Sequence, residues 1–146
     1  MKSHDQPKDV VIDANIMCFF DKPNQPEILK LFKWLKTSGT LAVSRKLVNE
    51  YMGCSSRPIL ILINYLSRVG RYHLYSNKDI DAFKLDRHYN YTCNRKDISH
   101  ARLVFLSFRK RLITSDRRLA NDVNKFKRIK GIKACACGTP ISCCLN

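Results

Sequence analysis

Apolar and polar positions follow one another along the chain in blocks that predict strands separated by helices. The run Val10, Val11 and Ile12 is β-branched throughout, which is typical of a strand buried on both of its faces. Further short runs that read as strands begin at intervals of 17 to 40 residues. The predicted strands are residues 10–12, 40–43, 72–75, 112–114 and 129–136.

Apolar residues three and four positions apart predict the helices between these strands. In residues 26–36 they recur along one face, and Pro26 stands in the first turn, where proline is tolerated. Ser44 is a good capping residue for the next helix, and Gly53 closes it. The predicted helices are residues 14–20, 26–36, 44–52, 55–69, 97–108 and 117–123, with a shorter one near 79–85.

Strands that alternate with helices predict an α/β fold, namely a three-layer α/β/α sandwich around a mainly parallel sheet. The chain has 146 residues, of which 45% are hydrophobic, so we expect residues 1–146 to form one domain with a substantial core. The longest apolar run, residues 59–63, ends at Asn64 and is far shorter than the ~20 residues of a membrane span. We therefore expect no membrane partner.

Four acidic residues occupy comparable places in this predicted fold. Asp13 and Asp116 directly follow predicted strands, and the carboxyl ends of parallel strands meet at one edge of a sheet. Glu50 and Asp97 lie on the core-facing edges of their helices. Three of these acids also have an ordinary alternative role: Asp13 can cap a helix, Glu50 can reach water and Asp97 can sit in a first turn.

If these carboxylates converge, their mutual repulsion is costly, and a hard divalent cation relieves it. Mg²⁺ and Mn²⁺ prefer such oxygen ligands, and either ion can activate water and stabilise the charge that builds on a phosphodiester during in-line attack. We therefore expect Mg²⁺ or Mn²⁺ as the cofactor of a hydrolytic site.

The charge of the chain favours a polyanionic partner. Twenty-seven Lys and Arg residues stand against twelve Asp and Glu residues, for a net charge of +15. Arg111 precedes the strand that leads to Asp116, and Arg117 and Arg118 follow it. We expect these three arginines to form a phosphate-binding rim for RNA, the alternative being a solvated helix face.

With these motifs in place, the chain resembles the PIN-domain ribonuclease family from Val10 to about Leu145. The matching motifs are Val10-Val11-Ile12-Asp13-Ala14-Asn15, Glu50, Asp97, Ile113-Thr114-Ser115-Asp116 and Thr139-Pro140. The resemblance implies that Asp13, Glu50, Asp97 and Asp116 bind the catalytic metal, with Asn15 and Ser115 as polar supports beside them.

The single-domain size looks most like the VapC-type toxins of type II toxin–antitoxin pairs, which are endoribonucleases held inactive by a partner protein. The resemblance thus implies RNA as substrate and an antitoxin as partner. Two alternatives stay open: an RNA-processing nuclease outside such a pair, and a PIN-like RNA-binding or scaffold module whose acids no longer catalyse.

Seven cysteines, an odd number without paired spacing through the body of the chain, indicate reduced thiols in a cytoplasmic compartment. The cysteines at the end of the chain are not part of the family pattern. Cys135 and Cys137 suit strand packing better than a zinc site, which would also draw on Cys143 and Cys144.

Two further features have competing interpretations. The apolar helix around residues 59–66 is expected to be buried in the core, with a homodimer or antitoxin surface as the alternative. His100 lies one turn beyond Asp97, and we expect it at the surface rather than against substrate.

Overall fold

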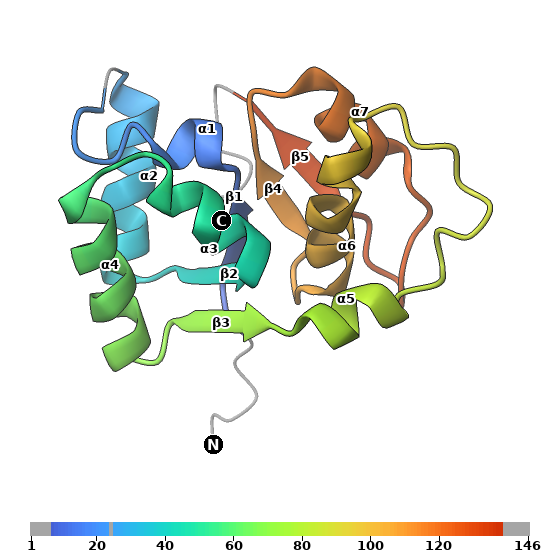
Figure 1. Ribbon diagram of the computed structural model, residues 1–146, viewed down its shortest axis with the longest axis horizontal. Coiled ribbons are helices and arrows are strands. Elements are labelled where there is room, and N and C mark those ends of the chain that lie inside the picture. The colour runs from blue at the N-terminus through green and yellow to red at the C-terminus, as the bar shows by residue number, and fades with distance from the viewer. Residues whose placement is uncertain (1–6, 24, 139–146) are drawn as a thin grey trace.

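The computed structural model describes residues 7–23 and 25–138. They form a five-stranded, all-parallel sheet in the order β3-β2-β1-β4-β5, so the first strand of the chain lies at its centre (Figure 1). The strands are β1 (Asp9–Ile12), β2 (Thr40–Ser44), β3 (Tyr72–Tyr75), β4 (Arg111–Ile113) and β5 (Cys135–Cys137).

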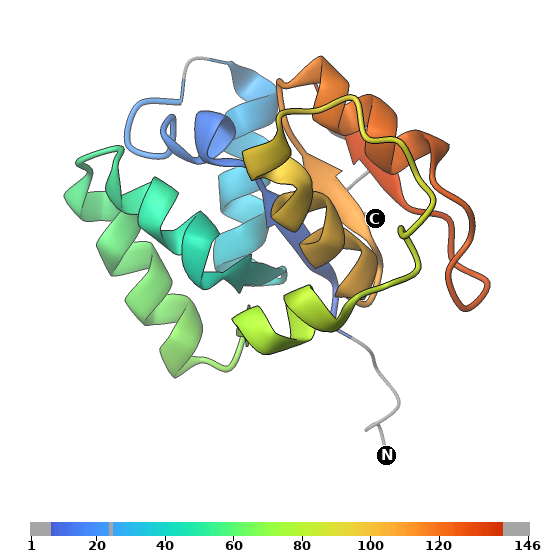
Figure 2. The same ribbon diagram turned by 45° about the vertical axis from the view of Figure 1, so that its right-hand side comes forward.

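Helices cover both faces of this sheet, and α2 and α6 lie on opposite sides of β1 (Figure 2). The predicted three-layer α/β/α sandwich is therefore confirmed. The helices are α1 (Ala14–Met17), α2 (Pro26–Thr37), α3 (Arg45–Met52), α4 (Arg57–Arg68), α5 (Asn77–Ala82), α6 (Ile98–Leu106) and α7 (Arg117–Lys125), and the 3₁₀ helix η2 (Arg95–Asp97) precedes α6.

The core is built around β1. Val10, Val11 and Ile12 have no exposed surface, as the β-branched composition of this run predicts. Because β1 pairs with β2 on one side and β4 on the other, its carboxyl end lies at the middle of the sheet edge. Asp13 therefore emerges beside the end of β4, held by a hydrogen bond from its backbone N–H to the carbonyl oxygen of Ile113 (2.9 Å).

The connection from α2 to β2 depends on two specific residues. A Cβ on Gly39 would lie 2.4 Å from the indole ring of Trp34, so only glycine fits there. The guanidinium of Arg71 donates hydrogen bonds to the carbonyl oxygens of Leu35 and Gly39 (2.6 Å each). Arg71 thus satisfies the Leu35 carbonyl, which the end of α2 leaves without a helical partner, and also binds the Gly39 carbonyl beyond the helix.

The last strand is shorter than predicted. Residues 129–136 were expected to be extended, but only Cys135–Cys137 pairs with β4. Residues 129–132 instead form a tight turn closed by an antiparallel bridge between Ile129 and Ile132. Lys130 and Gly131 have φ angles of +52° and +81° there, which a strand does not allow. Thr139, Pro140, Cys143 and Cys144 lie outside the described residues.

Two helices also end earlier than predicted. The first, expected over residues 14–20, stops at Met17. The helix expected over residues 97–108 begins as the 3₁₀ turn η2 and ends at Leu106. Phe108 consequently leaves the buried stripe of this helix and is 39% exposed, whereas Ala101 and Val104 are fully buried as expected.

The expectation of reduced thiols is wrong for Cys18 and Cys54, which form a disulfide. Cys137 is disulfide-bonded as well, which removes it from a thiolate zinc site. Cys93 and Cys135 are free thiols. The spacing of cysteines in the sequence could not reveal the bond between Cys18 and Cys54, because these residues are 36 positions apart and only the fold brings them together.

Helix α4 is buried on one face only. Ile59, Leu62 and Leu66 pack into the core, as expected, but Leu60 and Ile61 are 47% and 61% exposed. The expected burial in the core is therefore confirmed for one face of α4, and the opposite face forms an exposed apolar surface. Among the described residues, no helix is long and apolar enough to cross a membrane.

Candidate functional site

Asp13 occupies the site that its position after β1 predicts, and it also caps α1. Its Oδ1 accepts a hydrogen bond from the backbone N–H of Ala14 (2.8 Å). Its Oδ2 accepts a second one from the hydroxyl of Thr114, directly after β4 (2.6 Å). The capping role and a site role are thus compatible, because each carboxylate oxygen keeps a further lone pair.

Glu50 reaches the same edge of the sheet from α3. The neighbouring Tyr51 is fully buried and donates its hydroxyl hydrogen bond to the carbonyl oxygen of Ile12, the last residue of β1. The side chain of Ser44 caps the start of the helix by accepting a bond from Leu47 (3.1 Å). These contacts fix α3 against the end of β1, and the Glu50 side chain stays 34% exposed.

His100 is the residue that the sequence interpretation placed wrongly. It was expected at the surface, but it is only 1% exposed. Its Nε2 lies 3.0 Å from Oε1 of Glu50. Its Nδ1 is buried without a hydrogen-bond partner among the described residues. The sequence of α6 contained one sign that His100 is buried. Residues 98–106 are apolar on most sides, which is typical of a helix buried on two faces.

Asp13, Glu50 and His100 together form a group with the geometry of a metal site. One ligand atom from each lies within 4.8 Å of those of the other two. Two carboxylates and one imidazole suit Mn²⁺ and other borderline divalent cations better than Mg²⁺, which prefers oxygen ligands alone. Three protein ligands also leave coordination positions for water and substrate. The residues therefore fit a divalent cation.

Asp97 and Asp116 lie outside this group of three. Asp116 caps α7 with its Oδ1, which accepts hydrogen bonds from the backbone N–H groups of Arg118 (3.0 Å) and Leu119 (3.3 Å). Its own N–H donates to the Thr114 hydroxyl oxygen (3.0 Å). Thr114 therefore connects the backbone of Asp116 to the carboxylate of Asp13.

Asp97 ends the 3₁₀ turn before α6 and forms no capping bond with its side chain. Both acids act on the thiol of Cys93. Burial raises the pKa of Cys93 to about 12, with further contributions from the hydrogen bond and charge of Asp122 and from the charges of Asp97 and Asp116. Asp97 and Asp116 are thus near enough to Cys93 for their charges to raise its pKa, and their role as metal ligands stays a prediction.

The two predicted polar supports join the ends of β1 and β4. The backbone N–H of Ser115 donates to the side-chain oxygen of Asn15 (3.4 Å). Ser115 also lines a hollow of about 320 Å³ together with Asp116 and Arg117. This hollow adjoins the Thr114 hydroxyl that holds Asp13, so it offers room for a substrate group next to the site.

The predicted arginine rim is divided between the two ends of β4. Arg117 and Arg118 are exposed at the start of α7, beside Asp116. Arg111 is the first residue of β4, half-buried and paired with Cys135, at the strand end away from the site. Only the first two lie where a phosphate near the acidic group would meet them.

The disulfide between Cys18 and Cys54 ties together the two segments that carry Asp13 and Glu50. Cys18 is the residue that ends α1, and Cys54 follows the end of α3. The helices α1 and α3 also contact each other directly. The covalent link therefore restricts the separation of the two carboxylates.

No protein-family model matches the chain, and no curated protein matches it. The resemblance to PIN-domain ribonucleases thus rests on the motifs alone.

Proposed function

We propose that the protein is a divalent-metal-dependent endoribonuclease. The observation that carries the proposal is the convergence of Asp13, Glu50 and His100, with ligand atoms within 4.8 Å, at the carboxyl edge of a parallel sheet in a chain of net charge +15. An acidic group that can hold a metal, set in a basic molecule, suits a polyanionic substrate that is hydrolysed.

Each side chain has a task in this reaction. Asp13 and Glu50 hold the cation, and Thr114 orients the Asp13 carboxylate through its hydroxyl. His100 either ligates through Nε2 or donates from it to Glu50, and in both cases it fixes the Glu50 carboxylate. A divalent cation in this position supplies an activated water and neutralises charge on the phosphodiester. Asp97 and Asp116 are proposed as additional ligands.

RNA would approach over the start of α7. The exposed Arg117 and Arg118 stand beside Asp116 there, and Arg117 also lines the adjacent hollow. Arginine binds phosphate oxygens through paired N–H groups, so these two side chains suit a strand held next to the acidic group.

A role as the toxin of a toxin–antitoxin pair is part of the proposal because the outward face of α4 provides an apolar surface. Ile61 and Tyr65 line a groove of about 710 Å³ there with Phe20. Such a surface suits an antitoxin or a second copy of the chain.

RNA cleavage with and without metal tests the proposed activity. Purified protein is incubated with structured RNA in Mn²⁺, in Mg²⁺ and in EDTA, together with Asp13→Asn and the control Asp81→Asn, an exposed acid on α5. We expect cleavage in Mn²⁺ by the wild type and the control, and none by Asp13→Asn or in EDTA. If the wild type binds RNA normally but leaves it intact in Mn²⁺, the nuclease proposal is wrong and the protein is an RNA-binding module instead.

A further inference from the structure

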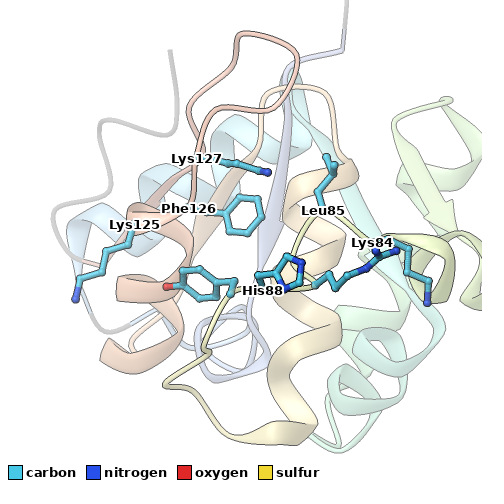
Figure 3. A pocket seen from close by; sticks show the side chains of 8 residues that line it. Lys84, Leu85, His88, Lys125, Phe126 and Lys127 are labelled. Carbon is cyan, nitrogen blue, oxygen red and sulfur yellow. The ribbon is translucent and has the colours of Figure 1, made fainter.

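A second cationic feature lies away from the acidic group, in a hollow of about 460 Å³ between two segments (Figure 3). One wall is the loop after α5, and the other is the end of α7. The lining residues are Lys84, Leu85, Arg87, His88, Tyr89, Lys125, Phe126 and Lys127. Four of them are Lys or Arg, and none is acidic.

The cationic groups of this hollow are available for a ligand. Lys84, Arg87 and His88 are exposed, as are Lys125 and Lys127. None of the five forms an ion pair with an acid in the described part of the chain. Four positive charges held around one concavity without neutralising partners raise the local concentration of anions.

Asp122 holds one wall of the hollow in place. This carboxylate of α7 has no exposed surface and accepts hydrogen bonds from the hydroxyl of Tyr89 (3.1 Å) and from the backbone N–H of Cys93 (2.8 Å). It also accepts hydrogen bonds from the backbone N–H (3.0 Å) and the hydroxyl (2.9 Å) of Thr92. The loop is therefore fastened to the helix that carries Lys125.

Asp86 and Phe126 fix the remaining parts. The buried Asp86 accepts hydrogen bonds from Arg102 of α6 (2.7 Å) and from the hydroxyl of Tyr91 (2.6 Å). Phe126 is 2% exposed and stacks on Phe105, with ring centroids 4.2 Å apart. The carboxylates of Asp86 and Asp122 are thus bound to groups inside the protein and do not neutralise the cations of the hollow. The same contacts hold the walls of the hollow in a fixed position.

The hollow lies at the far end of α7 from Asp116. Asp116 caps the start of this helix and Lys125 ends it. At 1.5 Å of rise per residue, nine residues span about 14 Å. At an axial rise of about 3.4 Å per nucleotide in a stacked strand, this distance corresponds to about four nucleotides.

We propose that this hollow binds the phosphate backbone of single-stranded RNA and anchors the strand about four nucleotides from Asp116 at the start of α7. The inference rests on the proposed function for the identity of the strand as substrate. A 460 Å³ concavity with cations on both walls is larger than one phosphate group requires. The half-buried ring of Tyr89 and the 52% exposed Leu85 add apolar surface for a base.

The test measures RNA affinity in EDTA, where no cleavage occurs. The variant Lys84→Gln/Lys125→Gln/Lys127→Gln is compared with Lys22→Gln/Lys30→Gln/Lys33→Gln, which removes three exposed charges in and before α2, on the other side of the sheet. The probe is a fluorescent oligouridylate of roughly twelve nucleotides, followed by anisotropy over a series of salt concentrations, together with a dinucleotide and inorganic phosphate as competitors.

We expect the hollow variant to bind the long probe about tenfold more weakly than the control variant at low salt. Its log–log salt slope should fall by about 2, since each lost phosphate contact removes ~0.7 on a single strand. Equal affinities and slopes for the two variants would overturn the proposal. Displacement of the long probe by inorganic phosphate as readily as by RNA would also overturn it, in favour of a small-anion site.

The two proposals fail separately. A wild-type protein that cleaves no RNA, while the hollow variant still loses affinity in EDTA, contradicts the nuclease and leaves the RNA anchor standing. A protein that cleaves RNA, with both lysine variants binding alike, contradicts the anchor alone. Thermal melts of both variants check that the fold is retained, as expected for exposed lysines.

Discussion

Removal of the Asp122 carboxylate is expected to be the most damaging single change outside the hydrophobic core. Asp122 is fully buried, and its two oxygens accept hydrogen bonds from Tyr89, Thr92 and Cys93. Asp122→Ala removes the acceptor of the backbone N–H groups of Thr92 and Cys93. It leaves the hydroxyls of Tyr89 and Thr92 only their longer contacts to the carbonyl oxygens of Asp122 (3.4 Å) and Arg118 (3.5 Å). The loop between α5 and η2 would then lose its attachment to α7.

The magnitude follows from the bonds. A hydrogen bond to a charged group contributes about 1.5–3 kcal/mol, and such contributions within one cluster are not additive. We expect Asp122→Ala to lower the free energy of unfolding by about 3–5 kcal/mol. Asp122→Asn retains one acceptor oxygen but turns an NH₂ group toward the N–H donors, so we expect a loss of about 2 kcal/mol.

The effect should depend on pH in a defined direction. Burial by itself raises the pKa of Asp122, but the hydrogen bonds from Thr92 and Cys93 outweigh it and bring the pKa below its usual value. A lowered folded-state pKa stabilises the protein above the unfolded-state pKa of about 4, and this stabilisation is lost as the pH falls through the folded-state value. The difference between wild type and Asp122→Asn should therefore shrink below about pH 4.

Urea unfolding at neutral and at acid pH measures both expectations. The control is Asn121→Ala, an exposed neighbour on α7 that should change the free energy of unfolding by at most about 0.5 kcal/mol. If Asp122→Ala unfolds within about 0.5 kcal/mol of the control, or if its deficit is the same at acid pH, the carboxylate does not fasten the loop.

Three other predictions concern the surface, the RNA path and the disulfide. Ile61→Glu should give a soluble, folded protein because the side chain is 61% exposed, and insoluble protein would contradict the apolar surface on α4. Arg117→Ala/Arg118→Ala should reduce the salt slope of RNA binding by about 1.4, and an unchanged slope would put the RNA on another face. Cys18→Ser should lower the free energy of unfolding by about 2–4 kcal/mol through loss of the link to Cys54, and equal urea midpoints would show that the link is absent in solution.

The sequence predicts the fold and the position of Asp13 well, since both depend on local pattern. The β-branched run of β1 indicates burial without reference to the rest of the chain, and Asp13 follows that run directly. Glu50 was also placed correctly on the edge of α3, because the helical spacing that buries Tyr51 determines where its neighbour lies.

His100, the disulfide and the length of β5 required the tertiary structure. His100 faces Glu50 across a separation of fifty residues, and its own helix gives no sign of that partner. The turn at Lys130 and Gly131 overrides the strand propensity of the flanking isoleucines. Asp116 was placed correctly after β4, whereas Asp97 ends the 3₁₀ helix η2 instead of lying in α6. A sequence pattern also cannot show that one carboxylate oxygen of Asp116 caps α7.

The central claim is that Asp13, Glu50 and His100 hold a divalent cation, and the shift in melting temperature caused by Mn²⁺ tests it most directly. The proteins are wild type, Asp13→Asn and the control Asp81→Asn, each in EDTA and in Mn²⁺. A ligand specific to the folded state stabilises it by about 2.7 kcal/mol at a hundredfold excess over its dissociation constant.

Asparagine also caps helices, so Asp13→Asn should melt within a few degrees of wild type in EDTA. We expect Mn²⁺ to raise the melting temperature of wild type and control alike and to leave Asp13→Asn almost unchanged. A full Mn²⁺ shift in Asp13→Asn, or no shift in the wild type, would contradict the metal site.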